Sequence, residues 1–300
     1  GGGKMKKLKT YANAWFFLGF WFVIFFFFTL LPIITAIGIS FTSFDMVNAP
    51  VFVGFSNYIR MFLDDDIFVK AFANTMLFAI ITGPVGYILS FTVAWLINDM
   101  SRQVKNILTF LFYSPSLIGS SYMMWMYLFS NDSYGILNSF LLNWGIIKAP
   151  IQWLYDPEYN FFVVVVVILW MGMGNGFLSF VAGFKQLNKS YYEAAAIDGL
   201  KNRWQELWYI TLPQMRPQLL IGAVLSVSGA FAVGAQNAVL TGMPSTDYST
   251  HTLVLHIQDY GNTRLEMGYA SSVAVVLFVI MTVSWVLINK AISAVSPSEG

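Results

Sequence analysis

Long stretches without Asp, Glu, Lys or Arg recur along the chain and determine its predicted architecture. Each is longer than the roughly 20 residues that an α-helix needs to cross the hydrocarbon core of a bilayer. The pattern therefore predicts six membrane-spanning helices, at about residues 15–40, 71–97, 107–129, 160–182, 218–241 and 267–289. A shorter uncharged stretch, 133–147, contains Asn138 and Asn143 and predicts an external helix at the membrane surface.

The distribution of positive charge predicts which loops face the cytoplasm. Twelve of the 16 Lys and Arg residues fall in the N-terminal segment 1–13, the loop 99–105, the loop 185–217 and the residues after the last span. Cations are retained on the cytoplasmic side of an energised membrane. Both termini are therefore expected in the cytoplasm, with residues 14–291 forming one transmembrane domain and 292–300 a tail.

The first apolar stretch follows four lysines, as the core of a secretory signal does. It is too long for a signal peptide, and no Ala-x-Ala cleavage site follows it. We interpret it as a retained first span, and Gly1 to Gly3 as a remnant of cloning.

Composition supports the membrane assignment and removes several functional classes. Of the 300 residues, 57% are hydrophobic and 10% charged, against about 25% charged in a soluble domain. A net charge of +1 without long basic blocks argues against nucleic acid as a partner. The absence of cysteine excludes disulfides and thiolate metal sites. No Gly-x-x-x-x-Gly-Lys motif is present to bind the phosphates of ATP.

Prolines and small residues predict a bundle of bent, closely packed helices. Pro32, Pro84 and Pro115 fall inside predicted spans, where other helices must satisfy the carbonyls that proline leaves without a donor. The fifth span is rich in Gly, Ala and Ser around Gly222 and Gly229, which allows backbones to approach closely.

The loop 185–217 contains signals for two helices. Ser190 and Glu193 have the spacing of a capping box, so a helix is expected from Ser190 to Asp198, with Gly199 ending it. Asn202 and Gln205 predict a second start. The second helix is expected to be amphipathic, with Trp204, Leu207, Trp208, Thr211 and Leu212 on one face, and to stop at Pro213.

The same residues resemble a known family. Glu193-Ala194-Ala195-x-x-Asp198-Gly199, followed by Trp204-Gln205 and Ile210-Thr211-Leu212-Pro213, is similar to the EAA motif of ABC importer permeases. The resemblance implies the six-span type I importer fold and a helix that docks in a cleft of a cytoplasmic ATPase subunit. The residues expected to couple to that subunit are Tyr192, Glu193, Ala194, Ala195, Asp198, Gly199, Leu212 and Pro213.

Further motifs resemble the carbohydrate-uptake subfamily, whose best-known member is the maltose transporter with its larger permease. They are Trp125-x-x-Leu128-Phe129, Gly135-Ile136-Leu137-Asn138, Trp170-x-Gly172, Leu240-Thr241-Gly242 and Met267-Gly268-Tyr269-Ala270. The sequence departs from the family pattern at Asn188-Lys189, Leu200, Leu207 and Met243-Pro244, which weakens the assignment of a substrate.

The resemblance also implies the partners of the chain in a bacterial cytoplasmic membrane. These are a second, unlike permease, two ATPase subunits that bind ATP and Mg, and an extracytoplasmic solute-binding protein that delivers a sugar. The chain itself would hold no cofactor and would not be an enzyme.

Polar and aromatic residues inside the spans are the candidates for a sugar path. Hydroxyl partners and aromatic faces bind sugars, and polar groups in a span face the bundle interior. The candidates are Tyr122 and Trp125 in the third span, Met171, Gly172 and Asn175 in the fourth, and Ser228, Gly229, Ala232, Gln236 and Asn237 in the fifth. A lone Asn or Ser equally fits hydrogen bonding between helices.

Several alternatives remain open at this point. The same scaffold fits import of a peptide or amino acid. An ATP-independent carrier or channel, or a membrane-embedded enzyme, would need charged or nucleophilic groups inside the spans, and the six windows hold no Asp, Glu, Lys or Arg. His251 and His256 are not expected to bind metal, and Asp64–Asp66 is expected to be a solvated loop or a contact for a binding protein.

Overall fold

The computed structural model describes residues 18–295. The segment 1–13, with Gly1 to Gly3, the first residues of the first predicted span and the end of the tail 292–300 lie outside the described residues. The regular secondary structure of the described residues is helical, apart from one isolated bridge between Thr42 and Phe52. The chain therefore has an all-helical fold, as the sequence predicts.

The chain divides into two compact units. The first comprises residues up to Asp64 together with Ile257–Val276, and the second comprises Asp65–His256 and the residues from Leu277. In the first unit, α2 (Leu31–Ser40) and α3 (Ser56–Leu63) are followed, much later in the chain, by the π-helical turn η4 (Asp259–Thr263) and the start of α16 (Met267–Val295).

The second unit contains most of the helices, in the order of the chain. They are α4 (Asp66–Asn98), α5 (Arg102–Leu117), α6 (Met123–Leu128), α7 (Ile136–Asn143), α8 (Pro157–Gly172), α9 (Asn175–Gln186), α10 (Lys189–Ile197), α11 (Arg203–Glu206), η2 (Leu207–Thr211), α12 (Leu212–Gln214), α13 (Arg216–Phe231), α14 (Ala235–Thr241) and η3 (Thr246–Tyr248). The boundary between the units falls inside α15 (Leu253–Gln258) and again inside α16.

Four described helices are long and apolar enough to cross a membrane. They are Leu18–Ser40, Asp66–Asn98, Pro157–Gln186 and Met267–Lys290. A fifth crossing results if α13 and α14, which meet at a bend of 43°, count as one span. Five of the six predicted spans therefore correspond to a helix or to a bent pair of helices.

The third predicted span, 107–129, is not one continuous helix. α5 has 16 residues, which corresponds to about 24 Å at 1.5 Å per residue, less than the roughly 30 Å of a hydrocarbon core. Pro115 lies in its last turn, and residues 118–122 form turns before α6 begins. The small and polar residues around Gly119 do not favour continuation of a helix.

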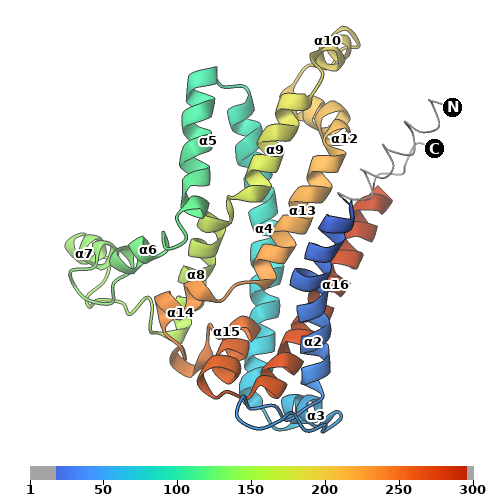
Figure 1. Cartoon of the computed structure of the whole chain (residues 1–300). Coiled ribbons are helices and arrows are strands. Elements are labelled where there is room, and N and C mark those ends of the chain that lie inside the picture. Colours follow the sequence, from blue (N-terminus) through green and yellow to red (C-terminus); the bar gives the residue numbers. More distant parts are fainter. Residues whose placement is uncertain (1–17, 296–300) are drawn as a thin grey trace, which may run out of the picture. The chain divides into compact units, whose positions relative to one another are not determined.

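Three helices of the second unit, α4, α9 and α13, pack side by side (Figure 1). The predicted close approach in the fifth span is confirmed at Gly222, where an added Cβ would overlap the ring of Phe180. A side chain there would push α13 away from α9. Phe177 and Phe180 on α9 and Met215 before α13 are fully buried in the same cluster.

Two prolines are accommodated by a widened helical turn. Pro32 follows the π-helical turn η1 (Phe26–Leu30), and Pro213 follows η2 in the same way, as the second residue of the next α-helix. Proline removes one donor and its ring collides with the carbonyl one turn earlier, and a π-turn moves that carbonyl aside. These prolines therefore lie within continuous helical segments.

The start of α4 corrects the prediction of a solvated Asp64–Asp66 loop. Asp65 is 9% exposed and caps α4 by accepting from the Phe68 N–H at 2.9 Å. Its other carboxylate oxygen lies 3.2 Å from Nε2 of His256, which is fully buried. The sequence run of three aspartates gave no sign that one of them, Asp65, is the N-cap of a helix.

Candidate functional site

The segment between α9 and α13, residues 187–215, is the candidate site that the sequence singled out; we name it the coupling segment. Its first helix, α10, and the N-cap of that helix lie two residues earlier than the capping box predicts. Asn188 is the N-cap, because its side chain accepts from the Ser190 N–H at 3.0 Å. Ser190 therefore lies inside the helix, and the predicted serine cap is wrong.

The end of α10 agrees with the prediction. Gly199 has a φ of 93°, in the region that residues with a side chain rarely adopt. The Gly199 N–H donates to the carbonyl of Ala196 at 3.3 Å, and the Leu200 N–H donates to the carbonyl of Ala195 at 3.0 Å. These two bonds form a complete Schellman motif, so a glycine is required at this turn.

The second helical part of the coupling segment begins as predicted and ends later. Asn202 caps α11 by accepting from the Gln205 N–H at 2.9 Å, and Oε1 of Gln205 accepts from the Lys201 N–H at 2.9 Å. The helical path then runs through η2 and α12 to Gln214. The prediction that Pro213 stops this helix is wrong, because η2 accommodates the proline.

The buried face of this helix is narrower than the predicted one. Leu207, Ile210 and Thr211 are buried, whereas Trp204 and Trp208 are 62% and 64% exposed. The buried residues keep the i, i+3, i+4 spacing of one helical face, and the two tryptophans lie at its exposed side. Only Leu207 and Thr211 of the predicted face are buried.

A hydrogen-bonded chain joins α10 to the second helix. The Tyr192 hydroxyl lies 2.8 Å from Oγ1 of Thr211. The Thr211 hydroxyl in turn donates to the Glu206 carbonyl at 3.2 Å. Since the threonine proton is used towards Glu206, Tyr192 is the donor to Thr211. Burial raises the pKa of Tyr192, so its hydroxyl keeps its proton at neutral pH.

The predicted ATPase-coupling residues lie mostly on the surface of α10. Glu193, Ala194, Asp198 and Gly199 are exposed, whereas Ala195 is buried. Leu212 is half-buried and Pro213 exposed, on the second helix. α10 projects at the end of α9 beyond the packed helices of its unit (Figure 1), and Tyr191 and Ile197 leave apolar surface on it, at 57% and 87% exposed.

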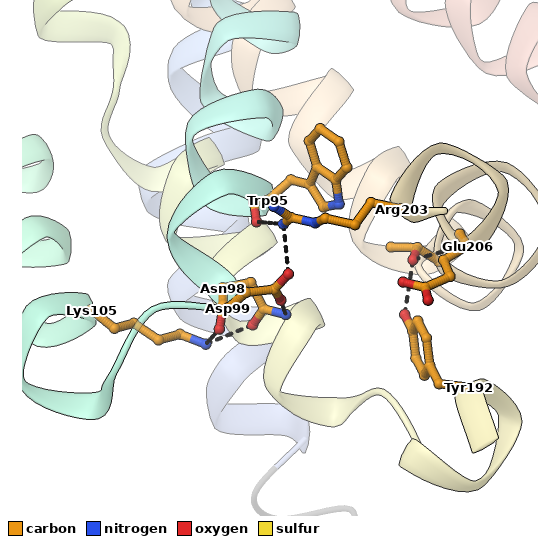
Figure 2. Close-up of polar contacts among 8 residues, drawn as sticks. Trp95, Asn98, Asp99, Lys105, Tyr192, Arg203 and Glu206 are labelled. Carbon is orange, nitrogen blue, oxygen red and sulfur yellow. Dashed lines mark hydrogen bonds and ion pairs between the residues drawn. The ribbon is translucent and has the colours of Figure 1, made fainter. Parts of the chain in front are cut away.

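The coupling segment is fastened to the end of α4 by residues that sequence reasoning missed. Arg203 pairs with Asp99, which follows the last residue of α4, at 2.7 Å. The Arg203 guanidinium lies 4.7 Å from the centre of the Trp95 ring. Figure 2 shows Arg203 beside Trp95 and Asp99. The partners are far apart in sequence, and neither belongs to a motif, so no local pattern identifies them.

A cavity of about 330 Å³ lies between α4, α8 and the bent pair α13–α14 of the same unit. A second cavity of about 260 Å³ adjoins it, because Ser116, Met171, Gly172, Leu225 and Ser226 line both. Hydroxyl and amide groups of Thr82, Ser116, Ser226 and Gln236 supply polar surface to the larger cavity. Both lie where helices break, at Met173–Gly174 and at Ala232–Gly234.

Half of the predicted path residues line the larger cavity. Met171, Gly172, Gly229, Ala232 and Gln236 do so. Sequence reasoning missed Ser116, Ser226 and Thr82, because an isolated hydroxyl in a span carries no signal that separates a cavity wall from a contact between helices.

The other predicted path residues lie elsewhere in the second unit. Asn237 is fully buried and donates to the Thr250 carbonyl at 2.7 Å. Trp125 stacks on Phe129 with ring centres 5.7 Å apart, and Tyr122 packs against the same cluster. Ser228 is exposed outside both cavities. Asn175 begins α9 between two glycines that line the smaller cavity.

The comparison with known families identifies the chain. The family described as "Binding-protein-dependent transport system inner membrane component" matches residues 86–294, which include every residue that lines the cavity except Thr82, and the whole coupling segment. The chain belongs to this family. It is a permease subunit of a bacterial ABC importer, a multi-pass component of the inner membrane, and the ATPase activity resides in partner subunits.

Relatives resemble this permease along most of their length. It is 29% identical to the probable ABC transporter permease protein YesP of Bacillus subtilis, over 98% of this chain and 96% of that one. It is 29% identical to the lactose transport system permease protein LacF of Rhizobium radiobacter, over 92% and 93%. The arabinooligosaccharides transport system permease protein AraP of Bacillus subtilis is 29% identical over 91% and 86%.

Solved structures show the same fold. A chain of a bacterial ABC transporter that imports the acidic polysaccharide alginate matches with a TM-score of 0.79 and 21% identity, over 97% of this permease and 99% of that chain. A chain of the alginate transporter in complex with its periplasmic protein, bound to an alginate pentasaccharide, matches with a TM-score of 0.80 over 98% of each. The permease therefore has the helical membrane fold of these importers.

Proposed function

We propose that this permease translocates a sugar or an oligosaccharide that a solute-binding protein delivers. The observation that carries the proposal is the cavity of about 330 Å³, which hydroxyl and amide groups of several helices line. Such groups bind sugar hydroxyls. Relatives named for lactose and for arabinooligosaccharides, similar over 92% and 91% of this chain, support the substrate class.

We further propose six membrane crossings with both termini in the cytoplasm. α5, the turns at residues 118–122 and α6 together would make the third crossing, and the bent pair α13–α14 the fifth. A broken helix is tolerated at membrane depth where it lines a cavity, and Ser116 near the end of α5 lines both cavities. The excess of Lys and Arg in the predicted cytoplasmic loops supports this orientation.

The coupling segment would transmit work from the ATPase subunits. α10 is short and projecting, and its Schellman end holds it at a fixed angle to the next helix. Its exposed Glu193 offers a charge to a cationic partner, and its exposed alanines allow another backbone to approach closely. We propose that Tyr192 to Gly199 form the docking surface for the ATPase subunit. Leu212 and Pro213 would lie at the end of the coupling segment that is nearer the membrane.

The working complex would hold a second, unlike permease, two ATPase subunits that bind ATP and Mg, and the binding protein. The path residues of this chain would be those that line the cavity: Met171, Gly172, Gly229, Ala232 and Gln236. Asn175, at the start of α9, would complete them, whereas Tyr122, Trp125, Ser228 and Asn237 would support the surrounding helices.

Reconstitution tests this function. The complete complex in liposomes, with its binding protein outside and ATP inside, should accumulate radiolabelled lactose or arabino-oligosaccharide, and neither a dipeptide nor an amino acid should compete. Concentrative uptake by the permease without the ATPase subunits would contradict the proposal. Competition by the dipeptide or the amino acid would contradict the substrate class.

Reversal of charge at Glu193 tests the docking surface. Glu193→Lys should leave membrane insertion intact and lower uptake at least about ten-fold, because a lost charge contact in a docked interface costs 1.4 kcal/mol or more. Gln186→Lys, an exposed position just before α10, is the matched control and should transport normally. Full uptake and substrate-stimulated ATP hydrolysis by Glu193→Lys would show that the contact is elsewhere.

A further inference from the structure

The end of α4 receives its cap from the coupling segment. Last-turn carbonyls of a helix have no donor within that helix. The Arg203 guanidinium supplies one to the Trp95 carbonyl at 3.4 Å, and it also pairs with Asp99 at 2.7 Å. A cation at this position also interacts favourably with the helix dipole. Both groups therefore hold Arg203 at one point of α4.

Aromatic stacking fixes the orientation of this contact. The guanidinium lies over the Trp95 ring, 4.7 Å from its centre, and the Trp95 and Trp204 rings lie 5.1 Å apart. A planar guanidinium satisfies a carboxylate, a carbonyl and a ring face together, which an ammonium group does not. Figure 2 shows Arg203, Trp95 and Asp99 meeting between α4 and the coupling segment.

The contact is too exposed to serve mainly stability. The side chains of Arg203 and Asp99 are 44% and 57% exposed, and exposed ion pairs contribute about 0–1 kcal/mol. Its position matters more than its strength, because it joins two elements that the fold otherwise connects through α9 and α13.

Arg203 also lies on a continuous chain of contacts. On one side, Tyr192 of α10 is bonded through Thr211 to the Glu206 carbonyl, in the helical path that Arg203 begins. On the other side, α4 carries Thr82 and Gly86 into the wall of the larger cavity. A shift of α10 that is passed through Arg203 would therefore displace a wall of the cavity.

We infer that Arg203 is the positioning residue through which movement of the coupling segment reaches α4 and the cavity. This inference rests on the proposed function of the coupling segment. The contact of Arg203 with Asp99 and Trp95 would be the point at which the coupling segment acts on α4. Lys105 supports the same point, since it donates to Oδ1 of Asn98 at 2.6 Å from the first turn of α5.

The test measures substrate taken up per ATP hydrolysed by the complete complex in liposomes. Arg203→Gln and Asp99→Asn should each lower this ratio about five-fold or more, the lower end of ordinary coupling between sites. ATPase subunits should still copurify, and ATP hydrolysis should continue. Arg203→Lys should also be impaired, because it retains the charge and loses the planar stack. Lys201→Gln, exposed in the same turn, is the control.

Charge exchange provides the decisive arm. The single variants Arg203→Asp and Asp99→Arg should each lower the uptake per ATP. The double variant that combines them should recover part of this loss, because it restores an ion pair of reversed polarity. A normal ratio in Arg203→Gln would overturn the inference, and so would loss of ATPase copurification as the main defect, which would make Arg203 a docking residue. If the unmodified complex shows no ATP-driven uptake, the proposed function itself fails, so the two failures are distinguishable.

Discussion

The two ends of α4 are held by different kinds of contact. At its start, Asp65 and His256 are 9% and 0% exposed and pair at 3.2 Å. At its end, Asp99 and Arg203 pair at 2.7 Å with half-exposed side chains. Breaking a buried pair leaves a carboxylate without its partner and costs about 3–5 kcal/mol, whereas an exposed pair contributes about 0–1 kcal/mol.

The buried end belongs to a larger polar network. Two carbonyls, those of Tyr248 and His251, accept from Asn74 of α4 at 2.8 and 2.9 Å. The Leu253 N–H donates to Oγ1 of Thr75 at 2.9 Å. The segment 248–256 is thus tied to α4 at several points. If the proposed function holds, we expect this end to stay fixed during transport and the end near α10 to move.

The largest expected effect follows from breaking the buried end. Asp65→Leu removes the helix cap and the partner of a buried histidine, which should cost about 3 kcal/mol of stability. The thermal midpoint of the detergent-purified protein should fall by about 6 to 12 °C. Asp65→Asn retains a capping oxygen, so its thermal midpoint should lie between those of Asp65→Leu and the unmodified protein. Asp64→Asn, exposed next to it, should unfold like the unmodified protein, and an equal loss there would remove the contrast.

A smaller effect separates two neighbouring side chains. Asn237 is fully buried and bonded to the Thr250 carbonyl, whereas Gln236 lines the cavity. Asn237→Ala should cost about 1–3 kcal/mol of stability and leave the substrate range of the surviving protein unchanged. Gln236→Ala should leave the thermal midpoint unchanged and reduce uptake. Uptake assays and thermal unfolding of both variants test this division. A lower thermal midpoint in Gln236→Ala, or a changed substrate range in Asn237→Ala, would contradict it.

The sequence was most informative where the physics is local. The turn at Gly199 and the cap at Asn202 depend on residues a few positions apart, so a motif identifies them. Pro213 was misread because a π-turn precedes it, and a pattern read at 3.6 residues per turn does not predict such a turn. The six windows predicted the helices, yet the break after α5 depends on the competition between helix propensity and packing around the cavity.

Contacts between distant segments were beyond sequence reasoning for a different reason. Asp99 and Arg203 are each ordinary surface residues in their own segments, and only the fold brings them together. Asp65 stood between two other aspartates, so its burial had no compositional signal. The candidate path was half predictable, because Met171 and Gly172 lie beside a tryptophan motif, whereas Ser116 and Ser226 resemble any hydroxyl in a span.

The smallest effect is expected inside the moving end. Tyr192→Phe removes one half-buried hydrogen bond to Thr211, with a net cost of about 1 kcal/mol, and should loosen α10 from the second helix without unfolding the permease. Amide hydrogen exchange in residues 190–198 should become several-fold faster, while the thermal midpoint stays within error. Tyr191→Phe, 57% exposed beside it, should leave exchange unchanged. If Tyr192→Phe also leaves exchange unchanged, α10 is held by its backbone turn at Gly199 alone, and the contact chain from α10 to α4 would have to begin at that turn.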